Sequence, residues 1–207
     1  MKQGQLKELL YQALETEQGG ILIYETALRC AINEDLKKEW TEYLDQTRNH
    51  EQTVRRVMEK LNIDPEEDSP GRSVVHHIGQ SLVQAMEMAL EQGTPEGAEL
   101  VAAECVVLAE TKDHLNWELM GQFAEAAKGE EKDALQDAVD EVEDEEDEHL
   151  YHSTGWTREL WIQSLGMPAV LPPPEEEKDV KTAIGAALAK GSREDMLKKQ
   201  PHRQEVS

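Results

Sequence analysis

Several carboxylate and imidazole side chains occur where the long helical stretches of this sequence otherwise place inward-facing apolar residues. Buried carboxylates and imidazoles cost folding free energy unless they are paired or bind a metal ion. Together these two ligand types suit iron, manganese or zinc better than calcium. The sequence therefore predicts a metal site with six candidate ligands: Glu17, His50, Glu110, His114, Glu146 and His149.

Two pairs among these candidates have a spacing that brings both side chains to one ion. Glu110 and His114 are four residues apart, and Glu146 and His149 are three apart, so each pair lies on one helix face. The second pair is the less specific, because eight acidic residues lie within 140–148. The alternatives are a solvated acidic face and core histidines that are hydrogen-bonded to carboxylates.

Other candidates have structural alternatives of their own. Glu17 has only apolar neighbours on the inward-facing side of its predicted helix, but it could form an ion pair with Arg48 or Arg55. His50 could lie on the helix surface if Glu51 faced inward in its place. Both readings stay open on the sequence alone.

The elements that must position these residues are helices. Stretches of Leu, Ala, Glu, Gln and Lys are separated by breakers, which predicts long helices over 4–31, 35–61, 96–127 and 131–165 and a shorter one over 72–92. The short turns make each flanking pair of long helices antiparallel. The prediction is an all-α fold, an antiparallel four-helix bundle with a crossover helix between the second and third long helices.

The candidate ligands also fall at matching heights along this bundle. If the first hairpin turns near residues 33–34, Glu17 lies level with His50. If the second turns near residues 129–130, Glu110 faces His149 and His114 faces Glu145. With a rise of about 1.5 Å per residue, an error of two residues in a turn centre shifts these heights by only about 3 Å. Both hairpins therefore place carboxylates and imidazoles in one middle layer.

Charge and composition limit the class of protein. The chain has 207 residues, with 44 acidic against 21 basic side chains, a net charge of -23 and a single Phe. Such a charge argues against binding nucleic acid or an anionic membrane surface and favours cationic partners. With no apolar stretch long enough to span a membrane, no signal-peptide core and only Cys30 and Cys105, we expect a reduced, cytoplasmic protein.

The composition changes after residue 166. We expect residues 1–166 to form the bundle and residues 167–207 to form a Pro/Glu-rich linker followed by a mobile C-terminal arm. The stretch LPPPEEEKD predicts an extended segment, and DVKTAIGAALAK predicts one short helix.

The arrangement of candidate ligands resembles the ferritin-like di-metal carboxylate superfamily, which includes rubrerythrins and bacterioferritins. That site takes a Glu from each of two helices and a Glu-x-x-His motif from each of the other two. Here Glu17 and Glu110 match the single glutamates, and Glu146-Asp-Glu-His149 matches one motif. His50 ends the other motif, but Thr47 stands at its Glu position. This departure puts the second metal position in question unless Glu51 or His114 substitutes.

Four stretches within about residues 5–155 are similar in order and spacing to the bacterial general-stress ferritin-like (YciF-type) family. They are ALETEQ, YLDQT, LAETKDHLNWE and LQDAVDEVEDEEDEHL. In that register Glu143 and Asp113 also become candidate ligands. The resemblance implies two ions of iron or manganese per chain, with zinc as an alternative, and a ferroxidase-type or peroxidase-type reaction with Fe(II), O₂ or peroxide in a stress response. It also raises a homodimer or larger assembly.

A second hypothesis belongs to another functional class. The chain could be a metal-free helical-bundle stress protein that acts through protein–protein contacts, with the arm 167–207 binding a protein partner. The absence of a Glu at position 47 favours this version.

Overall fold

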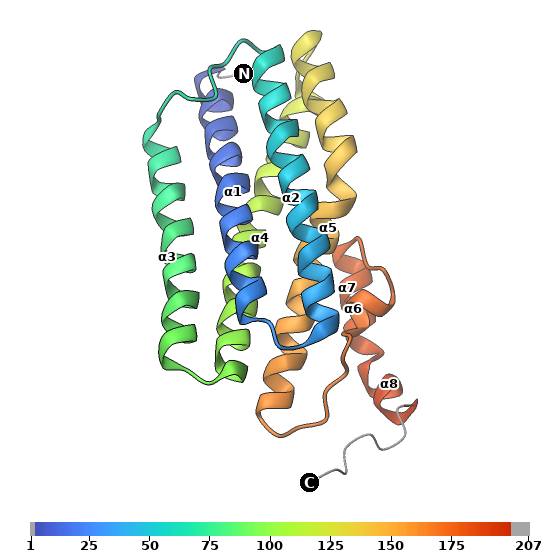
Figure 1. The fold of residues 1–207 in the computed structure, drawn as a ribbon. Coiled ribbons are helices and arrows are strands. Elements are labelled where there is room, and N and C mark those ends of the chain that lie inside the picture. The colour runs from blue at the N-terminus through green and yellow to red at the C-terminus, as the bar shows by residue number, and fades with distance from the viewer. Residues whose placement is uncertain (1–2, 200–207) are drawn as a thin grey trace.

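The computed structural model describes residues 3–199, which contain eight helices and no β-strand (Figure 1). The predicted all-α class is confirmed, and every predicted long helix begins and ends within two residues of its observed bounds. Five long helices lie side by side: α1 (Gln3–Cys30), α2 (Glu34–Lys60), α3 (Pro70–Gln92), α4 (Pro95–Ala126) and α5 (Glu130–Ser164). Three short helices follow: α6 (Pro174–Glu177), α7 (Ala183–Gly191) and α8 (Arg193–Lys199).

Local side-chain chemistry explains where the helices begin. Asn33 caps α2, since its side-chain oxygen accepts hydrogen bonds from the backbone N–H groups of residues 35 and 36. Helix α3 begins two residues earlier than predicted because Ser69 caps it and Pro70 is tolerated in the first turn. Gly129, with φ of 64°, makes the tight turn into α5.

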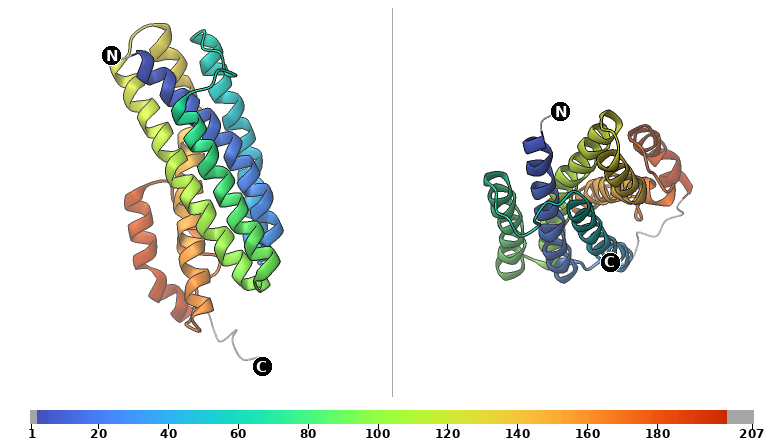
Figure 2. Two further views of the ribbon diagram at one scale, coloured as in Figure 1. Left: turned by 90° about the vertical axis from the view of Figure 1, so that its left-hand side faces the viewer. Right: turned by 90° about the horizontal axis from the view of Figure 1, so that it is seen from above.

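The five long helices alternate in direction along the chain. Helices α1 and α2 form one antiparallel hairpin, and α4 and α5 form another (Figure 1). Helix α3 carries the chain back between the hairpins, so that α2 and α4 run in the same direction (Figure 1). It packs on the outside, against α1 and α4 (Figure 2). Within residues 3–199, no helix combines the length and apolar character needed to cross a membrane.

The interior is divided into two apolar clusters with a polar layer between them. One cluster lies towards the start of α1 and includes Leu10, Leu14 and Met58. The other lies towards the end of α1 and includes Tyr24 and Trp40. Because these clusters close both ends of the bundle interior, the polar residues between them are cut off from water along the bundle axis.

The segment after α5 packs back onto that helix. Gly155 allows the close approach, because a Cβ atom there would lie 2.7 Å from Oε2 of Glu175. Arg158 donates two hydrogen bonds to the same carboxylate, at 2.7 and 2.8 Å. Arg193 of α8 pairs with Glu159 of α5 at 2.8 Å. The stretch expected to be extended thus contains the one-turn helix α6, and residues 200–207 of the expected arm lie outside the described residues.

Candidate metal centre

The polar layer gathers six fully or nearly fully buried ligand-type side chains from four helices. None is more than 4% exposed. They are Glu17 from α1, His50 from α2, Glu110 and Asp113 from α4, and Glu146 and His149 from α5. Within this layer the carboxylate and imidazole atoms form two groups, each with its three ligand atoms within 4.8 Å of one another.

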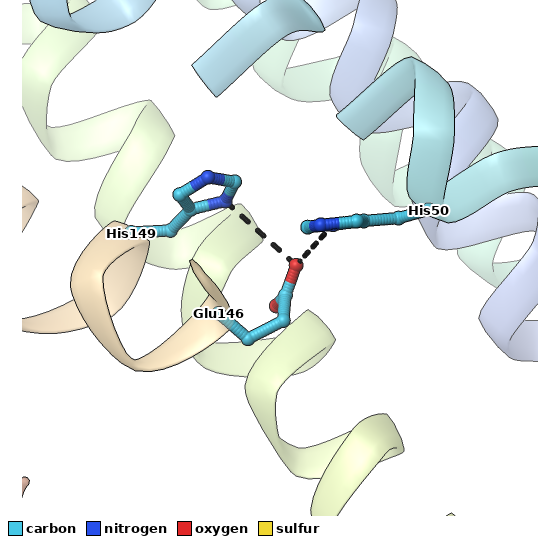
Figure 3. Close-up of side chains that lie close together, drawn as sticks. All are labelled: His50, Glu146 and His149. Carbon is cyan, nitrogen blue, oxygen red and sulfur yellow. Dashed lines mark ion pairs between the residues drawn. The ribbon is translucent and has the colours of Figure 1, made fainter. Parts of the chain in front are cut away.

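The first group consists of His50, Glu146 and His149 (Figure 3). Oε1 of Glu146 lies 2.8 Å from Nδ1 of His50 and 3.7 Å from Nδ1 of His149. Oε2 of Glu110 lies 3.5 Å from the same Nδ1 of His149. Both imidazoles therefore direct Nδ1 towards carboxylate oxygens, as they would towards a shared ion.

The outward nitrogen of each imidazole is held by a hydrogen-bond acceptor. Nε2 of His50 lies 2.7 Å from a carboxylate oxygen of Glu145, and Nε2 of His149 lies 2.8 Å from the amide oxygen of Gln46. Because an amide oxygen only accepts, Nε2 of His149 donates this hydrogen bond, and Nδ1 is the ring nitrogen that faces the group. Metal-binding histidines are oriented in this way, with the second ring N–H donating to an acceptor outside the ligand shell.

The second group consists of Glu17, Asp113 and Glu146 and contains only carboxylates. Nε1 of Trp117 donates to Oε1 of Glu17 at 2.8 Å, which leaves Oε2 of Glu17 as the oxygen nearer the group's interior. This Oε2 lies 4.0 Å from Nδ1 of His50, so the two groups adjoin. Glu146 belongs to both.

Seven buried ligand atoms of this layer have no hydrogen-bond partner, although two of them, Nδ1 of His50 and Oε1 of Glu146, contact each other as an ion pair at 2.8 Å. The seven atoms are Oε2 of Glu17, Nδ1 of His50, Oε2 of Glu110, Oδ1 of Asp113, both oxygens of Glu146, and Nδ1 of His149. Buried polar atoms are nearly always paired, and an unpaired one costs about 1–3 kcal/mol. Seven such atoms converge on one layer, which is the arrangement that the ligands of a metal ion take.

The negative charge of the layer also favours a cationic ligand. Four carboxylates are buried here, and no Lys or Arg within residues 3–199 forms an ion pair with any of them. Burial, followed by repulsion from neighbouring carboxylates, raises the pKa of Glu17 and of Asp113 well above the ordinary value. Burial alone would lower the pKa of His50, but the carboxylates of Glu145 and Glu146 outweigh it and raise this pKa to about 10. All three shifts favour the protonated forms, which carry less negative charge into the layer.

Five of the six predicted ligands meet in this layer. Glu17 lies beside His50 and Glu110 beside His149, as the matched heights predict. The layer also contains Asp113. The pattern of inward-facing positions did not predict this residue as a ligand, and only the family resemblance named it as a candidate. The signal for it was its spacing, since Asp113 follows Glu110 by three residues and so shares its face.

The structure does not bring His114 into the layer. Its Nε2 instead lies 2.8 Å from Asp147, and its side chain is 24% exposed. The predicted pairing of His114 with Glu145 is wrong, because Glu145 faces His50. One residue along a helix turns a side chain by about 100°, and on α4 Asp113 takes the inward direction.

Neither of the proposed substitutes for a Glu at position 47, Glu51 and His114, lies in the layer. Thr47 is buried, but its hydroxyl donates to the backbone carbonyl of Tyr43 at 2.8 Å. Glu51 turns away and pairs with Arg55 at 2.5 Å. The carboxylate that completes the second group is Asp113 of α4.

A cavity of about 250 Å³ between α4 and α5 connects the layer with the surface. Glu146 and Trp117 line its inner part, and His114, Glu143 and Asp147 also line it. On the other side of the layer, the ring of Tyr43 packs against His149 with a centroid distance of 4.2 Å. The layer thus borders a polar cavity at Glu146 and an aromatic ring at His149.

No protein-family model, curated protein or solved structure matches this chain.

Proposed function

We propose that this chain is a metal-binding protein with a ferritin-like four-helix bundle, whose polar layer holds two divalent ions of iron or manganese. The observation that carries the proposal is the set of seven buried, converging ligand atoms without hydrogen-bond partners. Zinc fits the same donors and is the alternative metal.

The two groups of ligands give the two ions different surroundings. His50, His149 and Glu146 form an imidazole-rich position, and Glu17, Asp113 and Glu146 form a carboxylate position. Glu146 belongs to both groups and neither of its oxygens has a hydrogen-bond partner, so this carboxylate would contribute to both positions. Four carboxylates and two divalent ions sum to zero charge, which removes the main cost of burying this layer.

When bound, iron or manganese supplies redox chemistry towards O₂ or peroxide, and the proposed reaction is Fe(II) oxidation or peroxide reduction. The chain's own residues orient the ligands and control access to the layer. Glu145 and Gln46 hold the two imidazoles in place, and Trp117 fixes Glu17 by its hydrogen bond. The apolar clusters above and below exclude water, and the cavity beside Glu146 admits a small oxidant.

Anaerobic titration with Fe(II) or Mn(II), followed by calorimetry, tests the proposal. Wild-type protein should bind two ions tightly in this layer, and Glu146→Gln should bind at most one, because it removes the shared ligand. The matched control is Asp140→Asn, which removes an equal charge from an exposed site on the same helix that does not line the cavity. Equal binding by Glu146→Gln and wild type would refute the proposal.

Thermal unfolding separates this proposal from the metal-free alternative. An ion that binds only the folded state raises the melting temperature. A protein that acts through protein contacts alone would show no such rise with micromolar Fe(II), Mn(II) or Zn(II).

A further inference from the structure

The cavity between α4 and α5 follows both helices away from the polar layer. His114 and Asp147 show the register of these antiparallel helices, since Nε2 of His114 lies 2.8 Å from Oδ1 of Asp147. In this register Glu118 lies level with Glu143, and Glu125 lies two turns further from the layer. All five residues line the cavity. With a rise of about 1.5 Å per residue, its lining runs about 16 Å along α4.

The residues that line this cavity become less exposed towards the layer. Three carboxylates in its outer part are exposed: Glu118, Glu125 and Glu143. The side chains of His114 and Asp147 are half-buried, at 24% and 18% exposed. The side chain of Glu146 is only 2% exposed, and neither of its oxygens has a hydrogen-bond partner. An ion from solvent would meet the outer carboxylates first, then the pair of His114 with Asp147, and then Glu146.

The charge of the cavity selects what can use it. Five carboxylates line it, and none of its lining residues within 3–199 is Lys or Arg. The cavities beside α2 are both lined by Lys38, and the small one between α1, α3 and α4 is lined by Lys112. A cleft lined by charges of one sign concentrates ions of the opposite sign and speeds their arrival.

We infer that this cavity is the entrance through which hydrated divalent cations reach the layer, and that a divalent cation is the substrate it delivers. The inference rests on the proposed function, because the path ends at Glu146, which belongs to both ligand groups. The negative charge repels an anionic organic compound, and a neutral oxidant gains nothing from it. The entrance therefore favours Fe(II) as a substrate of this centre.

The competing entrance lies beside α2. Gln46, which holds His149, lines a surface cavity there together with Glu42 and Asp45. Lys38 also lines that cavity and lowers its attraction for cations. The two entrances can be separated, because each has exposed carboxylates that can be neutralised without touching a proposed ligand.

Stopped-flow mixing of the full chain with anaerobic Fe(II) measures the rate of entry. Trp117 lines the cavity and donates to Glu17, so a paramagnetic ion bound beside Glu17 should quench its fluorescence. Neutralising the outer carboxylates together, as Glu118→Gln, Glu125→Gln and Glu143→Gln, should lower the second-order rate constant about tenfold at low salt. The number of Fe(II) ions bound at equilibrium should stay the same.

The matched control removes the same number of charges from exposed positions on α2: Asp35→Asn, Glu42→Gln and Asp45→Asn. It lowers the net charge of the chain equally, so a rate within twofold of wild type would show that the position of the charges matters. Salt offers a second check, because the difference between wild type and the cavity variant should shrink as screening increases.

A blocking variant tests the path without changing its charge. A Cβ atom at Gly121 would lie 3.5 Å from Val139, an ordinary contact, so the helix accepts a side chain there. Gly121→Met should extend that side chain into the cavity and slow entry at low and at high salt. Gly4→Met, at an exposed position of α1 with open space around it, is its control.

The outcomes separate the entrance from the centre. Unchanged rates in both cavity variants, or an equal loss of rate in the α2 control, would overturn the entrance and leave the centre standing. Fewer ions bound by the charge variant at equilibrium would make one of its residues a ligand and would also overturn the inference. A wild-type chain that binds no Fe(II) would refute the centre and its entrance together.

Discussion

Replacing Asp113 with Asn should change the stability of the metal-free and the metal-loaded protein in opposite directions. Asp113 is buried among carboxylates, and its Oδ1 has no hydrogen-bond partner. The amide of Asn has nearly the same size, carries no charge and can donate to Glu17 or Glu146. The substitution therefore relieves repulsion in the metal-free protein and removes one of the three ligands of the carboxylate position.

The size of both effects follows from the site. Relief of one unsatisfied buried group is worth about 1–3 kcal/mol, and one kcal/mol shifts the melting temperature of a chain of this length by about 2–4 °C. Metal-free Asp113→Asn should thus melt about 2–12 °C above wild type. An ion at a hundred times its dissociation constant contributes about 2.7 kcal/mol, so losing it reduces the metal-induced rise by about 5–11 °C.

Differential scanning calorimetry of both proteins, with a chelator and with Mn(II), measures these shifts directly. Asn116→Ala is a useful control, since this residue lies one turn away on α4 and belongs to neither ligand group. If Asp113→Asn lowered the metal-free melting temperature and left the Mn(II)-induced rise unchanged, Asp113 would be a structural residue and the carboxylate position would be wrongly assigned.

Three further predictions concern pH, the cavity and the C-terminal segment. Burial among carboxylates raises the pKa of Glu17 and Asp113, and that of His50 is raised to about 10, so all three hold protons more tightly in the folded chain. Folding without metal is then favoured at low pH, and the melting temperature should fall between pH 6 and pH 9; a rise over this range would contradict the charge argument. His114→Ala should leave the number of ions bound, counted by mass spectrometry, unchanged, because His114 pairs outside the layer; loss of an ion would make it a ligand. Gly155→Ala should push α6 off α5 and speed proteolysis within residues 166–182, since its Cβ would lie 2.7 Å from Glu175; an unchanged cleavage rate would show that the packing adjusts.

The helices could be predicted from the sequence because their signals are local. Helix formers fill each stretch, and residues such as Asn33 and Gly129 mark the turns. The heights of Glu17 with His50 and of Glu110 with His149 followed from the turn positions alone, since the rise per residue is fixed.

The direction of each side chain around its helix was harder to predict. Asp113 and His114 are adjacent, and a stripe of apolar residues does not decide which of them faces inward. The structure decides it through packing, because Asp113 meets Glu17 of α1 and His114 meets Asp147 of α5. Because these contacts join different helices, the periodicity of a single helix does not predict which of the two residues faces inward.

The packing of the C-terminal segment was also beyond the sequence. Its Pro and Glu content favours an extended chain, but Gly155 leaves room on α5 and Arg158 supplies the charge that holds Glu175. Those partners lie about twenty residues earlier in the chain, so the composition of the segment alone does not predict the contacts with them.

The central claim is that two ions share Glu146 in one buried layer. Electron paramagnetic resonance of the Mn(II)-loaded chain tests this directly, because two Mn(II) ions bridged by a carboxylate are magnetically coupled. The account predicts the many-line spectrum of a coupled pair in the wild type, replaced in Glu146→Gln by the six-line signal of isolated Mn(II). A six-line signal alone in the wild type, or no bound manganese, would contradict it.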